Sequence, residues 1–282
     1  MHGFAVLRGG CGRCSAVGNQ RGSTLIELLV ASFIGLLVVG SAFEIYLTQH
    51  RNWIIQDQVT DAQQSARAAI RMLSGHIRMA GYGLPTGVDP IYASNADPDT
   101  LTLIYQPAGM CEAPLEQAMA SPSAELRCDG HDVSCFEVNK LAYIYDPGAD
   151  TGEYFAVTDV QQATSQILHT TTILSRIYPT GSLVFMVETY RFYVDCSDTL
   201  HPTLMIQTLG EAPQPYADNI EDLQFRYILQ NGDTVDVPNQ PTLVRRVLVA
   251  VVARTDKTDL QFEGEYRRRQ FATDVQVRNL GL

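Results

Sequence analysis

The stretch RGSTLIELLVASFIG, residues 21–35, places one carboxylate, Glu27, inside a run of apolar residues. An ionised side chain deep in hydrocarbon costs about 3 kcal/mol on insertion scales. No Lys or Arg lies between Ser23 and His50, so the apolar run holds no cation that neutralises this charge. We therefore expect the partner of Glu27 to come from outside this helix or to be created by cleavage of the chain.

The apolar run is long enough to cross a membrane. From Leu28 to Phe43 no residue is charged. About 20 helical residues span the hydrocarbon of a bilayer, and Ser23 to about Tyr46 supplies them. We therefore predict a membrane-spanning helix with Glu27 close to one of its ends.

The residues before this run form a basic leader. Residues 1–22 hold three arginines and no acid, and removing them would change the formal net charge from −11 to −14. Such a positive end stays in the cytoplasm. A secretory signal has its small residue after the apolar core, but Gly22 comes before it. Cleavage after Gly22 would keep the apolar helix and create an amine at Ser23, about one helical turn from Glu27.

Residues 22–31, GSTLIELLVA, resemble the class III signal of type IV prepilins and type II secretion pseudopilins. The resemblance implies that prepilin peptidase cleaves between Gly22 and Ser23 and methylates the new N-terminus. It also implies that Glu27 guides subunits into a helical filament. The family's usual first mature residue is phenylalanine, so the resemblance implies cleavage more firmly than methylation of Ser23.

Beyond the membrane run, the apolar residues keep a helical period. They recur every three or four positions at Ile55, Val59, Ala62, Ala66, Ala69, Leu73 and Ile77. This pattern predicts one helix from Thr24 to about Met79, roughly 80 Å long. Two glycines and a proline in residues 81–85 should end it. Its second half needs a globular domain against which to bury its apolar stripe.

After Leu84 the pattern changes to a period of two, which predicts strands. The predicted strands are residues 100–105, 141–145, 153–157, 183–194, 203–208 and 244–253. The last is apolar almost throughout, which predicts burial on both faces. The expected fold is α+β and pilin-like: a helical segment, residues 23–83, packed on one face of a mainly antiparallel β domain, residues 84–282.

Several interior segments are similar to the PilW family of minor pilins. They are residues 78–82, 217–227, 243–248 and 277–280, whereas residues 107–150 match no pattern. The resemblance implies a minor pilin that takes part in assembly or priming of a type IV pilus, at its tip. It implies a single-pass protein in the inner membrane of a Gram-negative bacterium, with the β domain periplasmic until it enters the pilus. Implied partners are other minor pilins, the major pilin, prepilin peptidase, the inner-membrane assembly machinery and, before assembly, membrane lipid.

Two other functions stay open at this point. A minor pseudopilin of a type II secretion system would differ in its membrane partners. A tip adhesin or membrane-anchored binding protein predicts a ligand-sized pocket or an exposed aromatic patch in residues 107–150. An ordinary membrane anchor is less favoured, because it has no use for Glu27.

Four cysteines belong to the part of the chain expected outside the cytoplasm, where thiols oxidise. They are Cys111, Cys128, Cys135 and Cys196, and they allow three pairings. Our interpretation pairs Cys111 with Cys128 and Cys135 with Cys196. A metal site that adds His131 is the less favoured alternative.

No pattern in the sequence favours catalysis, a cofactor or nucleic acid. The net charge of −11 argues against phosphate binding, and the basic run at residues 267–269 fits a solvated edge. Asp146, Asp150 and Glu153 share one turn, but their spacing matches no calcium loop, so a solvated turn is favoured. A C-x-x-C pair, Cys11 and Cys14, lies in the leader without two further zinc ligands. We expect a structural protein with no metal site.

Overall fold

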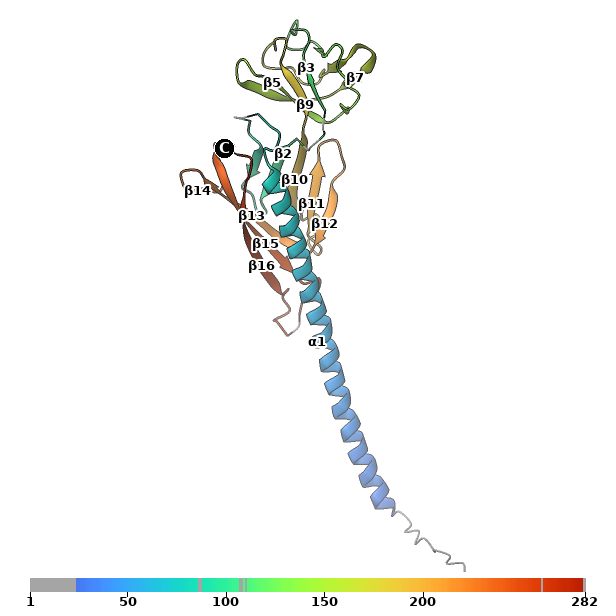
Figure 1. Ribbon diagram of the computed structural model, residues 1–282. Coiled ribbons are helices and arrows are strands. Elements are labelled where there is room, and N and C mark those ends of the chain that lie inside the picture. The colour runs from blue at the N-terminus through green and yellow to red at the C-terminus, as the bar shows by residue number, and fades with distance from the viewer. Residues whose placement is uncertain (1–23, 86–87, 107–108, 110, 260, 281–282) are drawn as a thin grey trace, which may run out of the picture. The chain divides into compact units, whose positions relative to one another are not determined.

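A computed structural model describes residues 24–85, 88–106, 109, 111–259 and 261–280 (Figure 1). In these ranges one long helix, α1 (Leu25–Met79), precedes strands that pair in antiparallel fashion. The α+β fold predicted from the sequence is therefore confirmed. The chain divides into two compact units, Met1–Trp53 and Ile54–Leu282, which are described separately below.

In the first unit, the described residues form the N-terminal part of α1, and their side chains are exposed. Among the described residues, α1 is the one helix long and apolar enough to span a membrane. Its hydroxyl groups are satisfied internally: Ser32 donates to the carbonyl of Leu28 (2.6 Å) and Ser41 to that of Leu37 (2.9 Å). A helix in hydrocarbon needs such internal partners, because lipid offers none.

Two sheets dominate the second unit. A five-stranded sheet has the order β1-β2-β10-β11-β12, and a four-stranded sheet has the order β14-β13-β15-β16. The first comprises β1 (Ile91–Ser94), β2 (Thr100–Tyr105), β10 (Glu188–Asp195), β11 (Thr203–Thr208) and β12 (Gln214–Asp218). The second comprises β13 (Ile220–Leu229), β14 (Thr234–Val235), β15 (Val244–Arg254) and β16 (Arg268–Gln276), with the short 3₁₀ helix η2 (Pro241–Leu243) before β15.

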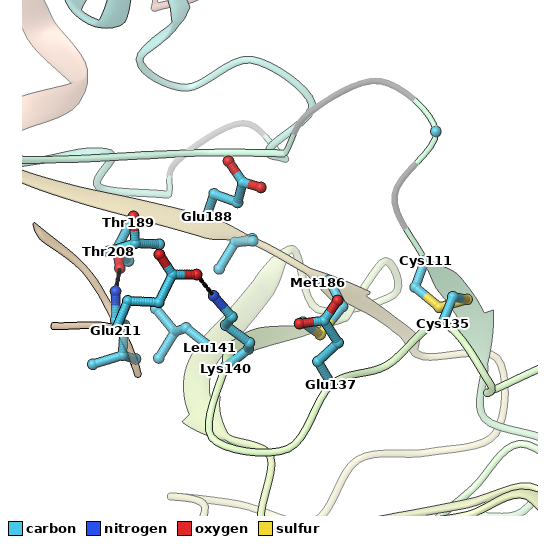
Figure 2. Close-up of a pocket in the computed structure, with 13 residues that line it drawn as sticks. Cys111, Cys135, Glu137, Lys140, Leu141, Met186, Glu188, Thr189, Thr208 and Glu211 are labelled. Atoms are coloured by element: carbon cyan, nitrogen blue, oxygen red, sulfur yellow. Dashed lines mark hydrogen bonds and ion pairs between the residues drawn. A yellow bond between two sulfur atoms is a disulfide. The ribbon is translucent and has the colours of Figure 1, made fainter.

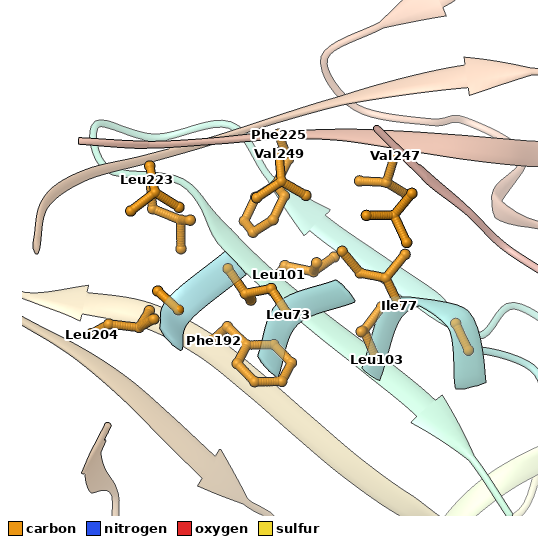
Figure 3. Packing of buried hydrophobic residues seen from close by; sticks show 14 of the residues in the cluster. Leu73, Ile77, Leu101, Leu103, Phe192, Leu204, Leu223, Phe225, Val247 and Val249 are labelled. Atoms are coloured by element: carbon orange, nitrogen blue, oxygen red, sulfur yellow. The ribbon is translucent and has the colours of Figure 1, made fainter. Parts of the chain in front are cut away.

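The C-terminal half of α1 packs against both of these sheets (Figure 3). Leu73 and Ile77 are fully buried, in one cluster with Phe192 of the five-stranded sheet and with Phe225 and Val249 of the four-stranded sheet. The predicted apolar stripe of the helix is thus confirmed from Ala62 onward. Burying a side chain the size of leucine contributes about 1.5 to 3 kcal/mol, so this cluster holds helix and sheets together.

Helix α1 ends where the sequence predicted. Gly81 and Gly83 both have positive φ (77° and 74°), a conformation that glycine adopts without a steric penalty. The side-chain amide of Asn279 donates to the carbonyl of Arg78 (3.1 Å), so the C-terminal tail caps the last turn. A Cβ on Gly81 would lie 2.7 Å from Leu280. Asn279 and Leu280 therefore pack against the C-terminal end of α1.

Residues 111–187 form an inserted module with a core of its own. Its core includes Phe155, Ile167 and Tyr178. Its two sheets have the orders β3-β9-β5-β6 and β4-β8-β7. The elements are β3 (Glu112–Pro114), β4 (Leu126–Arg127), β5 (Leu141–Asp146), β6 (Thr151–Ala156), β7 (Asp159–Gln161), η1 (Gln162–Thr164), β8 (Gln166–Leu168) and β9 (Leu183–Met186). The module is inserted between β2 and β10, which pair with each other.

One prediction about burial is wrong. Strand β15 was expected to be buried on both faces, but its burial alternates. Val247, Val249 and Val251 are at most 1% exposed, whereas Leu248 and Val252 are only half-buried. The four-stranded sheet covers the core with one face, so an apolar sequence does not place both faces of its central strand inside.

Candidate functional site

The first turn of α1 holds the candidate assembly residue in a reciprocal hydrogen-bonded arrangement. The backbone N–H of Thr24 donates to Oε2 of Glu27 (2.9 Å), and the N–H of Glu27 faces the hydroxyl oxygen of Thr24 (3.4 Å). This is a capping box, in which two otherwise unpaired N–H groups at the start of a helix find acceptors. A carboxylate here also faces the positive end of the helix dipole.

The cation predicted to neutralise Glu27, from outside its helix or at a new chain end, stays a prediction. Thr24 supplies an uncharged hydrogen-bond partner at the same helix end. An amide N–H is neutral, so the charge of Glu27 is solvated by one hydrogen bond and is not neutralised. Gly22 and Ser23, the predicted processing residues, lie outside the described residues. The role of Thr24 was not predicted, although the spacing Thr-x-x-Glu is the known sequence signal of a capping box.

The predicted disulfide pairing is wrong. The structure joins Cys111 to Cys135, with a Cα–Cα distance of 5.5 Å, and leaves Cys128 and Cys196 as thiols. The shorter loop from Cys111 to Cys128 does not close. Cys128 directly follows β4 in the module core, where its N–H donates to the carbonyl of Ser165 (2.9 Å). Cys196 is exposed after β10 and stays apart from Cys135.

The buried thiol of Cys128 has low reactivity. Burial, together with nearby carboxylates, raises the pKa of Cys128 to about 12, so its thiol stays protonated at neutral pH. His131, the alternative metal ligand, instead places Nε2 2.9 Å from Oε1 of Glu116. Among the described residues, the cysteines and His131 therefore do not form the alternative metal site.

The three carboxylates of the turn near residue 146 have separate protein partners. Asp146 forms an ion pair with Arg176. Asp150 accepts a hydrogen bond from the hydroxyl of Tyr145 (2.7 Å), and Glu153 accepts from the N–H of Ser175 (2.9 Å). Each carboxylate is therefore occupied by a different neighbour, and the three do not converge on a common point.

A cavity of about 340 Å³ lies where the inserted module meets the five-stranded sheet (Figure 2). An ion pair between Lys140 of the module and Glu211 of the β11–β12 turn borders it. Glu137, Glu188 and the Cys111–Cys135 disulfide also line it. Its volume reaches the lower end of the range for small-molecule sites, but its lining is more highly charged than is usual for such sites. Part of this lining belongs to residues 107–150, where the adhesin alternative predicted a pocket.

Comparison with known protein families adds one finding. Residues 18–43 match the model of the prokaryotic N-terminal methylation motif, a range that includes Gly22, Ser23 and Glu27. The match indicates a processed precursor of the type IV pilin or pseudopilin type, and with the apolar helix it supports a membrane-anchored, pilin-like protein. It does not extend to the segments that resemble the PilW family, so that assignment is unsupported. A search of curated proteins finds no match.

Proposed function

We propose that this protein is a minor pilin that takes part in assembly of a type IV pilus and is located at the pilus tip. In this proposal, prepilin peptidase cleaves after Gly22, and α1 holds the mature chain in the inner membrane until assembly. The observation that carries the proposal is the hydrogen bond from the Thr24 N–H to Glu27, because it holds the carboxylate of Glu27 against the backbone of Thr24, the residue next to the new N-terminus.

The charge of Glu27 gives the assembly step its driving force. One neutral hydrogen bond does not remove the cost of an ion in hydrocarbon, so a cation lowers the free energy further. The amine created at Ser23 of a neighbouring subunit is such a cation. Pairing between subunits would also set their axial register, because both charged groups lie at the start of the helix.

The β domain contributes lateral surfaces for other minor pilins and the major pilin. The chain has 282 residues, and a bulky β domain with an inserted module is easier to accommodate at a filament tip than in a shaft repeated thousands of times. The inner membrane, the periplasm and a Gram-negative host belong to this proposal by analogy with pilins. We propose a structural role and no catalytic activity.

The test compares two carboxylates on the same exposed stretch of α1. Glu27→Ala should abolish incorporation into pili, and Glu44→Ala should leave it intact, because Glu44 lies far from the new N-terminus. Recovery of each variant in sheared pili and in membranes separates failed assembly from failed insertion. Gly22→Ala should keep the leader on the chain, as measured by the mass of the N-terminal peptide. Normal assembly of Glu27→Ala would refute the proposal.

A second candidate function is favoured by one observation, the cavity beside Lys140 and Glu211. A tip-located binding protein would use it for a small polar ligand. Lys140→Ala should then abolish adhesion while pili still assemble. A pseudopilin of a secretion system is the third candidate, and crosslinking of the membrane-bound protein to its neighbours distinguishes it from a pilin.

A further inference from the structure

Three ring side chains form a ladder on one face of α1, within the first unit. The rings of Tyr46 and His50 are stacked, with centroids 6.0 Å apart and planes 1° apart. The rings of His50 and Trp53 follow at 6.3 Å and 17°. Tyr46 and Trp53 are 61% and 63% exposed, so the described residues of the first unit leave this ladder uncovered.

The opposite face of the same two turns is charged. Glu44 and Arg51 are seven residues apart, and at 3.6 residues per turn they lie roughly opposite the ladder. Phe43, one turn before the ladder, continues the ring-bearing face toward the apolar run. Helix α1 therefore changes from uniformly apolar to amphipathic within a few residues of Phe43.

The ladder lies where the apolar run ends. Leu25 to Tyr46 rises about 32 Å along the helix, which matches a hydrocarbon layer of about 30 Å crossed at a slight tilt. Trp53 follows about 10 Å further along. The headgroup layer adds about 5 to 8 Å, and helical side chains lean toward the N-terminus, so the Trp53 ring would reach back into that layer.

We propose that Tyr46, His50 and Trp53 form an interfacial anchor that binds the phospholipid headgroup layer and fixes the depth and rotation of α1 before assembly. The proposal rests on the membrane span assumed in the proposed function and goes beyond it by naming the residues that contact lipid. Amphipathic rings, which combine an apolar ring surface with a polar N–H or O–H group, favour this layer because it borders hydrocarbon on one side and water on the other.

Lipid fits the ladder better than a protein partner does. The rings continue the exposed apolar face without a break, so whatever solvates Phe43 also reaches Tyr46. His50 and Arg51, at the same height, offer polar and cationic groups to lipid phosphates. A neighbouring subunit that covered the ladder is the alternative occupant, and the experiment below distinguishes the two.

Trp53 is the single tryptophan of the chain, so its fluorescence reports on this site alone. The full-length protein is reconstituted into phosphatidylcholine and phosphatidylglycerol vesicles that carry a nitroxide quencher near the headgroup, midway along the acyl chain or at its end. We expect the headgroup quencher to act most strongly on Trp53. Quenching by no lipid, or strongest quenching by the deep label, would overturn the anchor.

A second reporter separates failure of the anchor from failure of the membrane span. Phe33→Trp in a Trp53→Phe background places the fluorophore inside the apolar run, where the deep quencher should dominate. If this reporter is quenched and Trp53 is not, the span stands and the anchor is wrong. If neither is quenched, both the anchor and the membrane-bound stage of the proposed function fail.

A matched pair of variants tests whether the ladder sets the depth. Tyr46→Ala with His50→Ala should reduce headgroup quenching of Trp53, because the neighbouring rings no longer hold it there. Thr48→Ala with Asn52→Ala changes the same two turns outside the ladder and should leave the quenching unchanged. The proposal would be overturned if the two pairs of substitutions had equal effects. It would also be overturned if Trp53 in detergent became shielded only when subunits associate, because that would point to a protein occupant.

Discussion

His76 joins helix α1 to the five-stranded sheet through its ring. Its Nδ1 lies 3.0 Å from the hydroxyl of Tyr105, and its ring centroid is 4.4 Å from that of Tyr190 and 5.2 Å from that of Phe192. Burial lowers the pKa of His76 below its ordinary value of 6.5. Arg71 lines the same shallow groove. It is a cation, so it does not stabilise the protonated form of His76.

This shift predicts that acid weakens the folded state. With the folded pKa below 6.5, the unfolded chain binds more protons at His76, so stability is complete above pH 6.5 and is lost as the pH falls through the folded pKa. His76→Gln, which cannot titrate, should therefore lose less stability than the wild type between pH 7.5 and pH 5.5. Urea unfolding of the full-length protein in detergent micelles, followed by circular dichroism, measures this difference.

His201 supplies a control of opposite sign. Hydrogen bonding to Asp198 raises the pKa of this exposed imidazole, so its contribution is complete below pH 6.5 and disappears as the pH rises through the folded pKa. His201→Gln should thus make the loss of stability in acid steeper. If His76→Gln instead shows the same pH dependence of stability as the wild type, protonation of His76 does not contribute to the loss of stability in acid, and the prediction is wrong.

At the scale of elements, two glycines predict opposite effects of the same substitution. A Cβ on Gly152 of β6 would lie 2.2 Å from the carbonyl oxygen of Ile144 and 2.5 Å from the ring of Tyr143, whereas one on Gly75 of α1 would meet nothing within 4 Å. Gly152→Ala should reduce the free energy of unfolding by about 1 to 3 kcal/mol through overpacking. Gly75→Ala should raise it by about 0.5 to 1 kcal/mol, because alanine favours the helix.

Thermal unfolding of both glycine variants in micelles checks this pair. Retained stability in Gly152→Ala would mean that strands β5 and β6 separate more easily than their register implies. Destabilisation by Gly75→Ala would mean that this face of α1 is covered by a neighbour in solution.

The disulfide also predicts an effect at this scale. Cys111 and Cys135 are 24 residues apart, and closing a loop of that size stabilises a protein by about 3.5 kcal/mol in the chain-entropy model. Cys111→Ser with Cys135→Ser should lower the free energy of unfolding by about 2 to 4 kcal/mol, and Cys196→Ser should change it by less than about 0.5 kcal/mol. Peptide mapping without reduction should recover Cys111 linked to Cys135. Recovery of Cys111 linked to Cys128 would contradict the structure.

The sequence predicted the elements that have a strong local pattern. Helix α1 repeats its apolar residues every three or four positions up to Ile77, and glycines follow at once, so both the helix and its end were predictable. Strands β4 and β7, of two and three residues, are too short to show a period of two. Residues 141–145 and 153–157 of the inserted module were predicted as strands, but the module was not predicted as a unit, because its fold depends on contacts between distant segments.

The candidate site was predictable to the same degree. Glu27 is conspicuous because it is a lone charge among apolar residues, which needs only the local sequence. The disulfide depends on the path of the chain, which brings Cys135 to Cys111 and leaves Cys128 as a buried thiol. The cavity beside Lys140 joins residues of the module to the β11–β12 turn, and no local pattern connects those segments.

At the scale of the second unit, the chain forms two cores with a junction between them. The helix and the two large sheets share one core, and the inserted module has another. A third, small cluster joins them, with Ile104 from β2 and Phe185 from β9. Lys140 and Glu211 add an ion pair across the same junction. The module is therefore attached by a small contact and by the two strands that lead into it.

This arrangement predicts that the module can be removed without loss of the main fold. Tyr105 of β2 and Glu188 of β10 are paired directly in the antiparallel register, so a short glycine-containing turn can join strands that are already neighbours. Replacing residues 107–187 with such a turn should give a chain that keeps α1 and both large sheets. Its stability should fall, because Ile104 loses its partners in the junction cluster.

Circular dichroism and urea unfolding in micelles test this prediction, with Ile104→Thr added as a matched change that relieves the newly exposed apolar surface. A single cooperative transition with the expected helical signal would show that the module is an insertion into a complete domain. Incorporation of the shortened chain into pili would then assign assembly to the helix and large sheets and leave the module free for binding. Failure to unfold cooperatively in either background would show instead that the two cores stabilise each other across the junction.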